Sequence, residues 1–593
     1  MATRNDNWVY DGFESCIDGM NMSMEGEHLS QTQFFKGINV VTRKGVLTTR
    51  FALAGWEISD PAAYIGVFQG AFRYQLNNAE IITWVLSGRI YVLNLTTGAL
   101  TDISTAFGVS MDMSARCYFC KAEKYLVIQD GINFPVYLDG IVAAAQMPGP
   151  NQVPIGTIMA YGHSRLFVVP VVEPISGEDG RRFIMAGDVY QPNNPTSVLT
   201  FTEIDYYAGG GAFALPAEMG FIGGIGFMRN QNSDSGYGPM IVLARRGAVC
   251  FAVNEPRETL YDLVTRTVVR EGWHDKDISQ VLFQDVGSAS PFSLLAVNAD
   301  LLFRGNKDGM RSLSTTITEA STTLRNASLS GEMQDVFKDG GDSMLSQVSS
   351  AYSDNRIMFT VIPADSEDYF KAISSLDMNI INNVKQQLPP SFDGVFTGPR
   401  WLQILTAEYD GRDRLFAFVK TDTGMQLVYE SDDAIADLDT YPINCRVYTR
   451  KFNFRRSDEL KHLDHLKLWV SGIEHDVSMS VYVRTDDFPF WTQLDQTATF
   501  KAPTTGRDQQ RRGVVFAANK KITDPIEGGD GLTGYVFQFC IVWSGYCKIK
   551  RGKARAVVVP ESDDAATVRA EEDVELSDTG QLDLESSDYQ NAW

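Results

Sequence analysis

Short β-rich runs separated by Gly, Asn and Asp turns recur from about residue 64 to residue 429, and they constrain the fold more than any other feature. Residues 81–86 and 89–95, for example, are two apolar runs flanking Ser87-Gly88, the pattern of a β-hairpin. Comparable runs lie at 124–138, 163–169, 240–253, 294–305, 356–361 and 414–419. Their spacing of roughly 8 to 15 residues, with weak self-similarity at about 40 to 50, is typical of propeller blades.

A single blade cannot bury both faces of its own sheet, so several blades must pack around a common axis. We therefore predict an all-β fold with few helices, in which a β-propeller covers residues 56–440. The same short strands would also suit a pair of stacked β-sandwiches, which stays open as an alternative.

Composition and charge narrow the class of protein. Of the 593 residues, 44% are hydrophobic, enough for a large globular core, and 52 Lys and Arg stand against 74 Asp and Glu, for a net charge of −22. This balance disfavours a conventional nucleic-acid binder, which needs a basic surface. No window approaches the roughly 18 to 20 apolar residues of a membrane span, and Met1 to Asp6 begin no apolar signal core. We expect synthesis in a cytoplasm and no membrane span.

Residues 1–55 form an N-terminal segment with a predicted hairpin. Between Gly37 and Arg50, two β-rich runs flank Lys44-Gly45, where glycine can supply the positive φ of a tight turn.

This segment resembles the N-terminal region of β-propeller virion proteins from the tails of short-tailed bacteriophages. Those proteins open with Gly-Met-Asn or Gly-Ile-Asn, a polar spacer, an Asn-Val-x-x-Arg-x-Gly turn and then x-x-Arg-Pro-Gly. Here Gly19-Met20-Asn21, Asn39 to Gly45 and Thr49-Arg50 match, whereas Phe51-Ala52 replaces Pro-Gly. Three further stretches resemble blade and crossover sequences of the same family: 163–167, 187–197 and 298–313.

Residues 441–560 contain longer strands with better alternation of apolar and polar residues, which predicts a half-buried antiparallel platform domain. This region gives the most specific match to the family, whose pattern runs Arg-x-Phe-x-Phe, Lys-x-Leu-x-x-Leu-x-Leu and Arg-x-Asp-x-x-Pro-x-Trp. The matching residues are Arg450, Phe452, Phe454, Lys461, Leu463, Leu466, Leu468, Arg484, Asp486, Pro489 and Trp491.

Three segments interrupt the strand pattern. Apolar residues spaced by three and four predict a helical insertion near 314–345, and the polar run at 365–390 predicts a loop between blades. Residues 561–593 form an acidic C-terminal tail with eleven acidic residues and one arginine, a composition typical of solvated chain.

The residues give no recognisable catalytic, cofactor or metal site. We interpret the cysteines as reduced, mostly buried thiols, including the Cys117 and Cys120 pair: Cys16, Cys117, Cys120, Cys250, Cys445, Cys540 and Cys547. His462 and His465 are three apart in a predicted strand, so we place them on opposite faces, which suits no metal pair. The glycines at 209–211 and 223–226 lack a strand-to-helix context and are interpreted as turns.

The resemblance implies a structural protein rather than an enzyme: a subunit of the tail nozzle or tube of the virion, with six copies in a ring. Such a ring contacts portal and adaptor proteins and tail fibres, and viral DNA passes through it without sequence-specific binding. From the net charge we expect a negative inner surface of the ring. The alternatives are a receptor- or glycan-binding propeller at the tail tip, where Trp401 and Trp491 could stack on sugars, and a propeller glycoside hydrolase.

Overall fold

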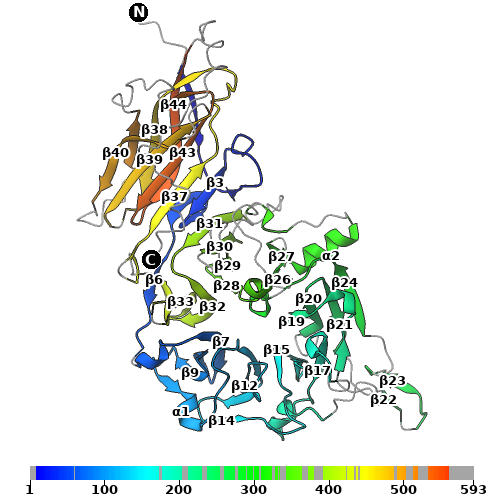
Figure 1. The fold of residues 1–593 in the computed structure, drawn as a ribbon. Helices are drawn as coiled ribbons and strands as arrows, with labels where there is room; N and C mark the ends of the chain where they lie inside the picture. The colour runs from blue at the N-terminus through cyan, green and yellow to red at the C-terminus, as the bar shows by residue number, and fades with distance from the viewer. Residues whose placement is uncertain are drawn as a thin grey trace, which may run out of the picture.

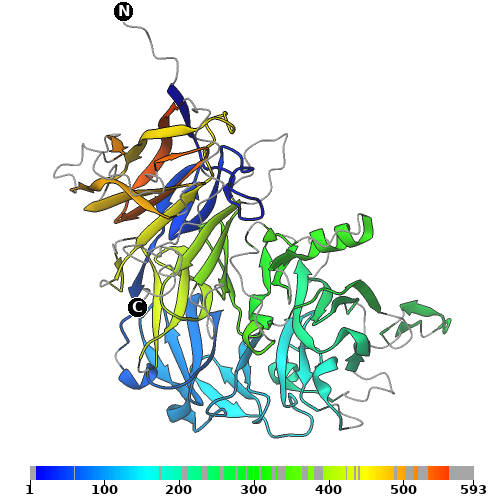
Figure 2. The same ribbon diagram turned by 45° about the horizontal axis from the view of Figure 1, so that its top comes forward.

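The computed structural model places a β-propeller beside a β-sandwich platform that stands on one edge of it (Figures 1 and 2). It describes residues 8–559 except 59, 173–176, 203–211, 230–236, 254–259, 263, 271, 274–277, 289, 298–299, 306–308, 323–327, 332, 334–341, 363–371, 379–390, 423, 433–435, 439–440, 474, 487–489, 502–511 and 519–531. The acidic tail at 561–593 lies outside the described residues, as do Gly209 to Gly211.

Six separate blade-sized antiparallel sheets make up most of the propeller, and the all-β propeller predicted from the sequence is confirmed. Their strands are β7 (Phe68–Leu76), β8 (Ala79–Leu86), β9 (Arg89–Asn94) and β10 (Leu100–Asp102); β11 (Tyr118–Ala122), β12 (Tyr125–Gln129), β13 (Val136–Asp139) and β14 (Ala143–Gln146); β15 (Gly156–Gly162), β16 (Arg165–Pro170), β17 (Phe183–Ala186) and β18 (Ala212–Ala214); β19 (Ile222–Arg229), β20 (Tyr237–Ala244), β21 (Gly247–Phe251) and β24 (Ser279–Gln284); β25 (Leu295–Val297), β26 (Asp300–Arg304) and β27 (Met310–Ser312); β32 (Trp401–Tyr409), β33 (Arg412–Lys420) and β34 (Met425–Ser431), with β6 (Ala52–Gly55).

The ring is closed by strands from distant parts of the chain. β6, from the N-terminal segment, is the outer strand of the sheet formed by β32, β33 and β34, so residues 52–55 join residues 425–431. The remaining place in the ring is taken by β28 (Ser350–Ser353), β29 (Arg356–Val361), β30 (Ala372–Asp377) and β31 (Ser391–Thr397). Apolar side chains fill the spaces between neighbouring blades, as where Val85 clusters with Ile128, and Phe167 with Val242.

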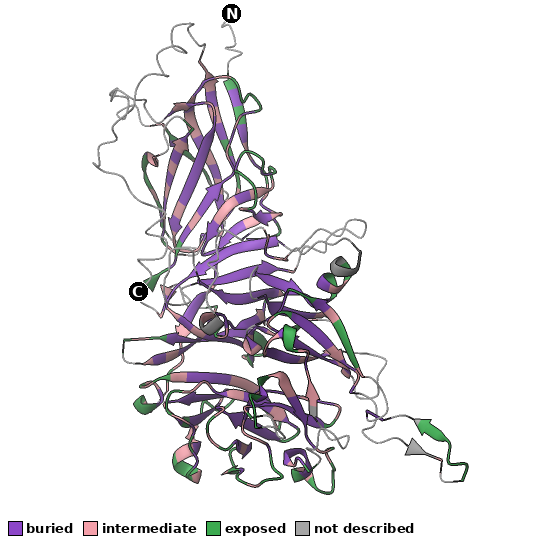
Figure 3. Cartoon of the chain, turned by 45° about the vertical axis from the view of Figure 1, so that its right-hand side comes forward, coloured by how far each residue is buried: buried purple, intermediate pink, exposed green. Residues whose placement is uncertain are grey.

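The sheet that begins with β28 does not end at the propeller. Beyond β31 it continues through β2 (Gly19–Met20), β3 (Gln33–Ile38), β37 (Asn444–Thr449), β43 (Phe537–Ser544), β39 (Val477–Thr485) and β40 (Thr492–Phe500), which gives ten strands in one sheet. Figure 3 shows buried residues along the strands that lead from the propeller into the platform. Propeller and platform are therefore joined by backbone hydrogen bonds across a shared sheet.

A second, seven-stranded sheet packs against this one to complete the platform. It contains β4 (Val40–Arg43), β5 (Val46–Thr49), β44 (Lys548–Val558), β38 (Lys461–Ser471) and β41 (Arg512–Ala517), with β1 (Trp8–Phe13) on β44 and β42 (Thr533–Gly534) on β38. Leu466 and Ala554 of this sheet share one core with Val481 and Ile541 of the ten-stranded sheet. Face-to-face packing of two antiparallel sheets is the sandwich arrangement.

The remaining elements are short. The helices are α1 (Ile103–Phe107), α2 (Leu313–Thr322), α3 (Asp342–Leu345), η1 (Pro61–Ala63), η2 (Gly180–Arg182), η3 (Pro195–Leu199), η4 (Ala217–Met219) and η5 (Pro291–Ser293), and two further hairpins pair β22 (Leu260–Tyr261) with β23 (Val268–Arg270) and β35 (Ala436–Asp437) with β36 (Tyr441–Pro442). α2 and α3 lie within the predicted helical insertion. Among the described residues, no helix has the length and apolar character to cross a membrane.

Two interpretations of the sequence are wrong in places. The predicted loop at 365–390 contains β30, which pairs with a strand on each side, and most of the rest of that range lies outside the described residues. The glycines at 223–226 lie in β19 rather than in a turn. A Cβ on Gly224 would lie 2.4 Å from Cδ1 of Leu294, so this glycine permits close packing of two blades.

Candidate functional site at the junction of propeller and platform

The polypeptide changes from one platform sheet to the other at Asn39, which lies between β3 and β4. Asn39 has a φ of 57° and is buried. Asparagine tolerates this left-handed conformation better than other side chains with a Cβ. Its side-chain amide donates to Thr397 Oγ1 (2.8 Å) and to the Asn444 carbonyl (2.9 Å), while its side-chain oxygen accepts from the Thr397 backbone N–H (2.9 Å). Asn39 thus ties the N-terminal segment to the propeller strand β31 and to the platform strand β37.

Arg50 completes the same network from the other end of the predicted hairpin. Its Nε donates to Asn39 Oδ1 at 2.9 Å, and its guanidinium forms a bidentate ion pair with Asp437. Both side chains are almost fully buried, with 2% and 6% of their surface exposed. Asp437 also accepts the backbone N–H of Leu53, on β6, at 3.0 Å. Arg50 and Asp437 therefore fix the strand that closes the propeller.

A second buried network lies next to the first, centred on Arg356 of β29. Its guanidinium donates to Asp393 (2.8 Å), Asp377 (3.3 Å) and the Thr42 carbonyl (3.0 Å). Asp393 in turn accepts from the backbone N–H of Thr42 at 2.7 Å and from Ser375 Oγ at 2.8 Å. The network joins three propeller strands to the β4–β5 hairpin of the platform.

Asp393 makes the stability of this junction dependent on pH. Burial raises the pKa of Asp393 to about 6, although the Arg356 guanidinium opposes the shift. An unfolded Asp has a pKa of about 3.9, so between about pH 4 and pH 6 the folded state binds a proton that the unfolded state does not. The contribution of Asp393 to stability therefore falls as pH rises through this window.

The variant Asp393→Asn removes this titration with little change in shape. We expect its free energy of unfolding to rise relative to wild type by on the order of 2 kcal/mol between pH 4 and pH 7. Urea denaturation of both proteins at several pH values measures the difference. A constant difference would contradict the protonation assigned to Asp393.

The residues of 441–560 that match the family pattern hold the platform together in a similar way. Arg450 forms a buried ion pair with Asp11 of β1 and donates to the Gly12 carbonyl at 3.1 Å. Phe452 packs on Phe539 with ring centroids 5.2 Å apart. These residues position strands, and none of their contacts leaves a reactive group facing an open site.

The propeller axis contains the kind of cavity in which other proteins bind small molecules. Its volume is about 420 Å³, and inner strands of different blades contribute Arg73, Phe119, Phe227, Gln403 and Thr406 to its wall. No Asp or Glu occurs among its described lining residues. Two polar side chains of the wall are already engaged. Gln403 Oε1 accepts from the Ala71 N–H at 2.9 Å, and Gln403 Nε2 donates to the Ala71 carbonyl at 2.8 Å. Arg73 is paired with Glu80.

Trp401 and Trp491, the two tryptophans that could stack on sugars in the glycan-binding alternative, lie in different environments. Trp401 is 2% exposed in a propeller core, where no sugar can reach it. Trp491 is partly buried between Tyr448, at 5.5 Å, and the Arg484 guanidinium, at 4.7 Å.

His462 and His465 lie on one face of β38, which corrects the expectation of opposite faces. The ladder between β38 and β44 shifts register between Leu463 and His465, so Leu463 and Leu466 both point into the core and both histidines point outward. His465 Nδ1 lies 2.5 Å from Asp464, and His462 Nδ1 lies 3.0 Å from Thr533. The part of the chain that the structure describes contains no cluster of His, Cys, Asp and Glu suited to a metal ion.

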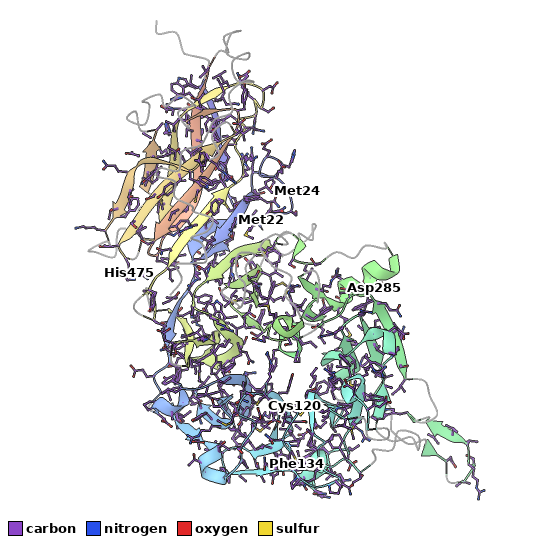
Figure 4. All side chains as sticks on the ribbon, in the orientation of Figure 1. Met22, Met24, Cys120, Phe134, Asp285 and His475 are labelled. Atoms are coloured by element: carbon purple, nitrogen blue, oxygen red, sulfur yellow. The ribbon has the colours of Figure 1, made fainter. Side chains whose placement is uncertain are left out.

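All seven cysteines are free thiols, and six of them are buried. Cys120 lies within the propeller (Figure 4) and belongs to a different core cluster from Cys117, because a spacing of three places the two on opposite faces of a blade. Burial raises the pKa of the Cys120 thiol to about 12. It is therefore protonated and unreactive at neutral pH.

Comparison with known proteins finds structural likeness only at low sequence identity and low TM-score among the matches given below. No family model and no curated protein matches this chain. Among solved structures, a chain of the mitotic checkpoint complex is 13% identical, with a TM-score of 0.33, over 65% of this chain and 94% of that one. The computationally designed Ika8 protein is 12% identical, with a TM-score of 0.32, over 64% of this chain and 99% of its own. The AfRom2 CNH domain is 9% identical, with a TM-score of 0.34, over 64% and 99%. At these scores the likeness carries no argument about this protein.

Proposed function

We propose that this chain is a structural subunit of the tail of a short-tailed bacteriophage, in a ring-shaped nozzle or tube component that conducts the genome during ejection. The observation that carries the proposal is the junction. Asn39, Gly45 and Arg50 match the motif of the tail proteins. Asn39 carries the chain from one platform sheet to the other, Gly45 forms the tight turn between β4 and β5, and Arg50 locks the propeller onto the platform. A motif whose residues make rigid connections suits a protein whose function lies in its contacts.

The axial cavity supports the same choice over a glycoside hydrolase. Such an enzyme needs two carboxyl groups facing the scissile bond, and the described lining of the cavity has none. The network that does contain several carboxylates, around Arg356, is buried at the junction and is satisfied by the protein itself.

Imaging purified tailed particles from the phage whose genome encodes this chain tests the proposal. We expect a closed ring of six copies in the tail, beneath the portal and adaptor, because rotational closure avoids open filaments. We also expect the isolated ring not to bind duplex DNA tightly at 150 mM salt, since a conduit must release the genome. Absence of the chain from the particles by mass spectrometry would contradict the proposal. Cleavage of a polysaccharide that is lost on changing one Asp or Glu would favour the hydrolase instead.

A further inference from the structure

The outer face of the seven-stranded platform sheet carries a concentration of cations and aromatic rings that is unexpected in a chain with a net charge of −22. Side chains that alternate away from the core on β1, β38 and β44 form this surface, which we name the basic aromatic face. Its residues are Trp8, Tyr10, Lys467, Trp469, Arg551, Lys553 and Arg555.

Strand register brings these side chains together in rows. Lys467 lies directly opposite Lys553, Trp469 opposite Arg551, and Tyr10 opposite Arg555. Like charges directly opposite each other on a sheet destabilise it, so the Lys467 and Lys553 pair costs stability unless an anion compensates.

Aromatic rings hold the cations in place. The Arg555 guanidinium lies 4.3 Å from the centroid of the Trp8 ring, that of Arg551 lies 4.1 Å from Trp469, and Lys553 Nζ lies 4.4 Å from Tyr10. Such contacts are favourable at a surface and restrict the rotamers of long side chains. Less conformational entropy is then lost when an anion binds.

Carboxylates of the described residues balance only part of this charge. Arg555 is paired with Asp464, and Arg551 lies 3.6 Å from Glu14, whose side chain is 85% exposed. Lys467 and Lys553 have no carboxylate within ion-pair distance among the residues that the structure describes. The face therefore has positive charge available for an acidic partner.

The chain itself contains a segment of complementary charge that begins beside the face. β44 ends at Val558, and residues 561–593 follow with eleven acidic residues against one arginine. Fully extended, 33 residues span about 110 Å, whereas the 11 residues of β44 span about 36 Å. The segment is thus long enough to reach every cation of the face, and its covalent attachment gives it a high effective concentration there.

We propose that the basic aromatic face binds the acidic segment 561–593 of the same chain. The carboxylates of the segment pair with Lys467, Lys553 and Arg551 and cover a surface that would otherwise attract other polyanions. This proposal does not depend on the proposed function.

Carbodiimide crosslinking of the full-length protein, read by mass spectrometry, tests whether the basic aromatic face binds residues 561–593. At low salt we expect amide crosslinks between Lys553 or Lys467 and acidic residues of 561–593, and none to Lys420, an exposed lysine of the propeller. In 1 M NaCl, where the Debye length is about 3 Å, these crosslinks should be lost. In a mixture of ¹⁵N-labelled and unlabelled protein, each crosslink should join peptides of the same label.

Arg551→Glu and Arg246→Glu form a matched pair of variants. Both change one exposed arginine and the net charge equally, but Arg246 lies between β20 and β21 of the propeller. We expect Arg551→Glu to lower the yield at Lys553 by about two- to fivefold, the effect of an exposed ion pair, and Arg246→Glu to leave it unchanged.

Three results would overturn the proposal. Equal yields in the two variants would show that the face does not hold the segment. Crosslinks between labelled and unlabelled peptides would assign the segment to a second copy. Absence of the crosslinks, together with duplex DNA binding that Arg551→Glu abolishes, would make the face a nucleic-acid surface.

Discussion

Replacing Arg50 by alanine is expected to destabilise the protein by about 3–5 kcal/mol, the usual cost of breaking a buried ion pair by removing one partner. The variant leaves Asp437 buried and without its cation, and it removes the donor that Arg50 gives to Asn39. Urea denaturation followed by circular dichroism measures the loss. Because the shared sheet couples propeller and platform, we expect both to unfold at a lower urea concentration.

Arg43→Ala is the control, since Arg43 lies in the same hairpin and pairs with Asp354 at 2.6 Å. Its side chain is 54% exposed and that of Asp354 is 37% exposed, so the pair is largely solvated. We expect a loss of about 1 kcal/mol or less. Similar losses for Arg43→Ala and Arg50→Ala would show that the buried network does not hold the junction.

Gly394→Ala is expected to destabilise the protein by about 2–5 kcal/mol through backbone strain and overpacking. Gly394 lies on β31 where this propeller strand meets β3, and its φ is 148°. A Cβ there would lie 2.6 Å from the carbonyl oxygen of Gly37, which is backbone and cannot rotate away. The two strands would have to separate at the point where the propeller becomes the platform.

The variant Gly411→Ala separates the effect of backbone strain from that of overpacking. Gly411 has a φ of 74° in the turn between β32 and β33, and a Cβ there would have no neighbour within 4 Å. Only the left-handed conformation is penalised, so we expect a loss of about 1–2 kcal/mol. Thermal unfolding of both variants gives the difference, and equal losses would refute the close approach of β3 and β31.

The sequence predicted the parts of the fold that local residues determine. The Lys44-Gly45 turn is one, because both residues have positive φ, 52° and 77°, as a two-residue hairpin turn requires. Blade strands are another, since a run such as 81–86 followed by Ser87-Gly88 defines a hairpin without reference to the rest of the chain.

Features that depend on distant partners were not predictable from the sequence. The run that includes Ile38 and Val40 looks like one strand, but Asn39 divides it between two sheets because its partners, Thr397 and Asn444, lie more than about 350 residues away. The register shift near Asp464 likewise reversed the expected positions of the histidines, and only the pairing with β44 reveals it. The buried Arg50 and Asp437 pair had no local signal beyond the match of Arg50 to the family motif.

The pairing of the first strand with the last has a consequence for how the protein is made. Phe13 of β1 is placed opposite Gly552 of β44, so a ribosome synthesises β1 about 540 residues before its partner. At about 5–20 residues per second, the interval is roughly half a minute to two minutes. During that time the nascent N-terminal strands present unpaired edges, which are sites of aggregation. A chaperone that shields them until translation ends would then govern how much of this protein reaches its native state.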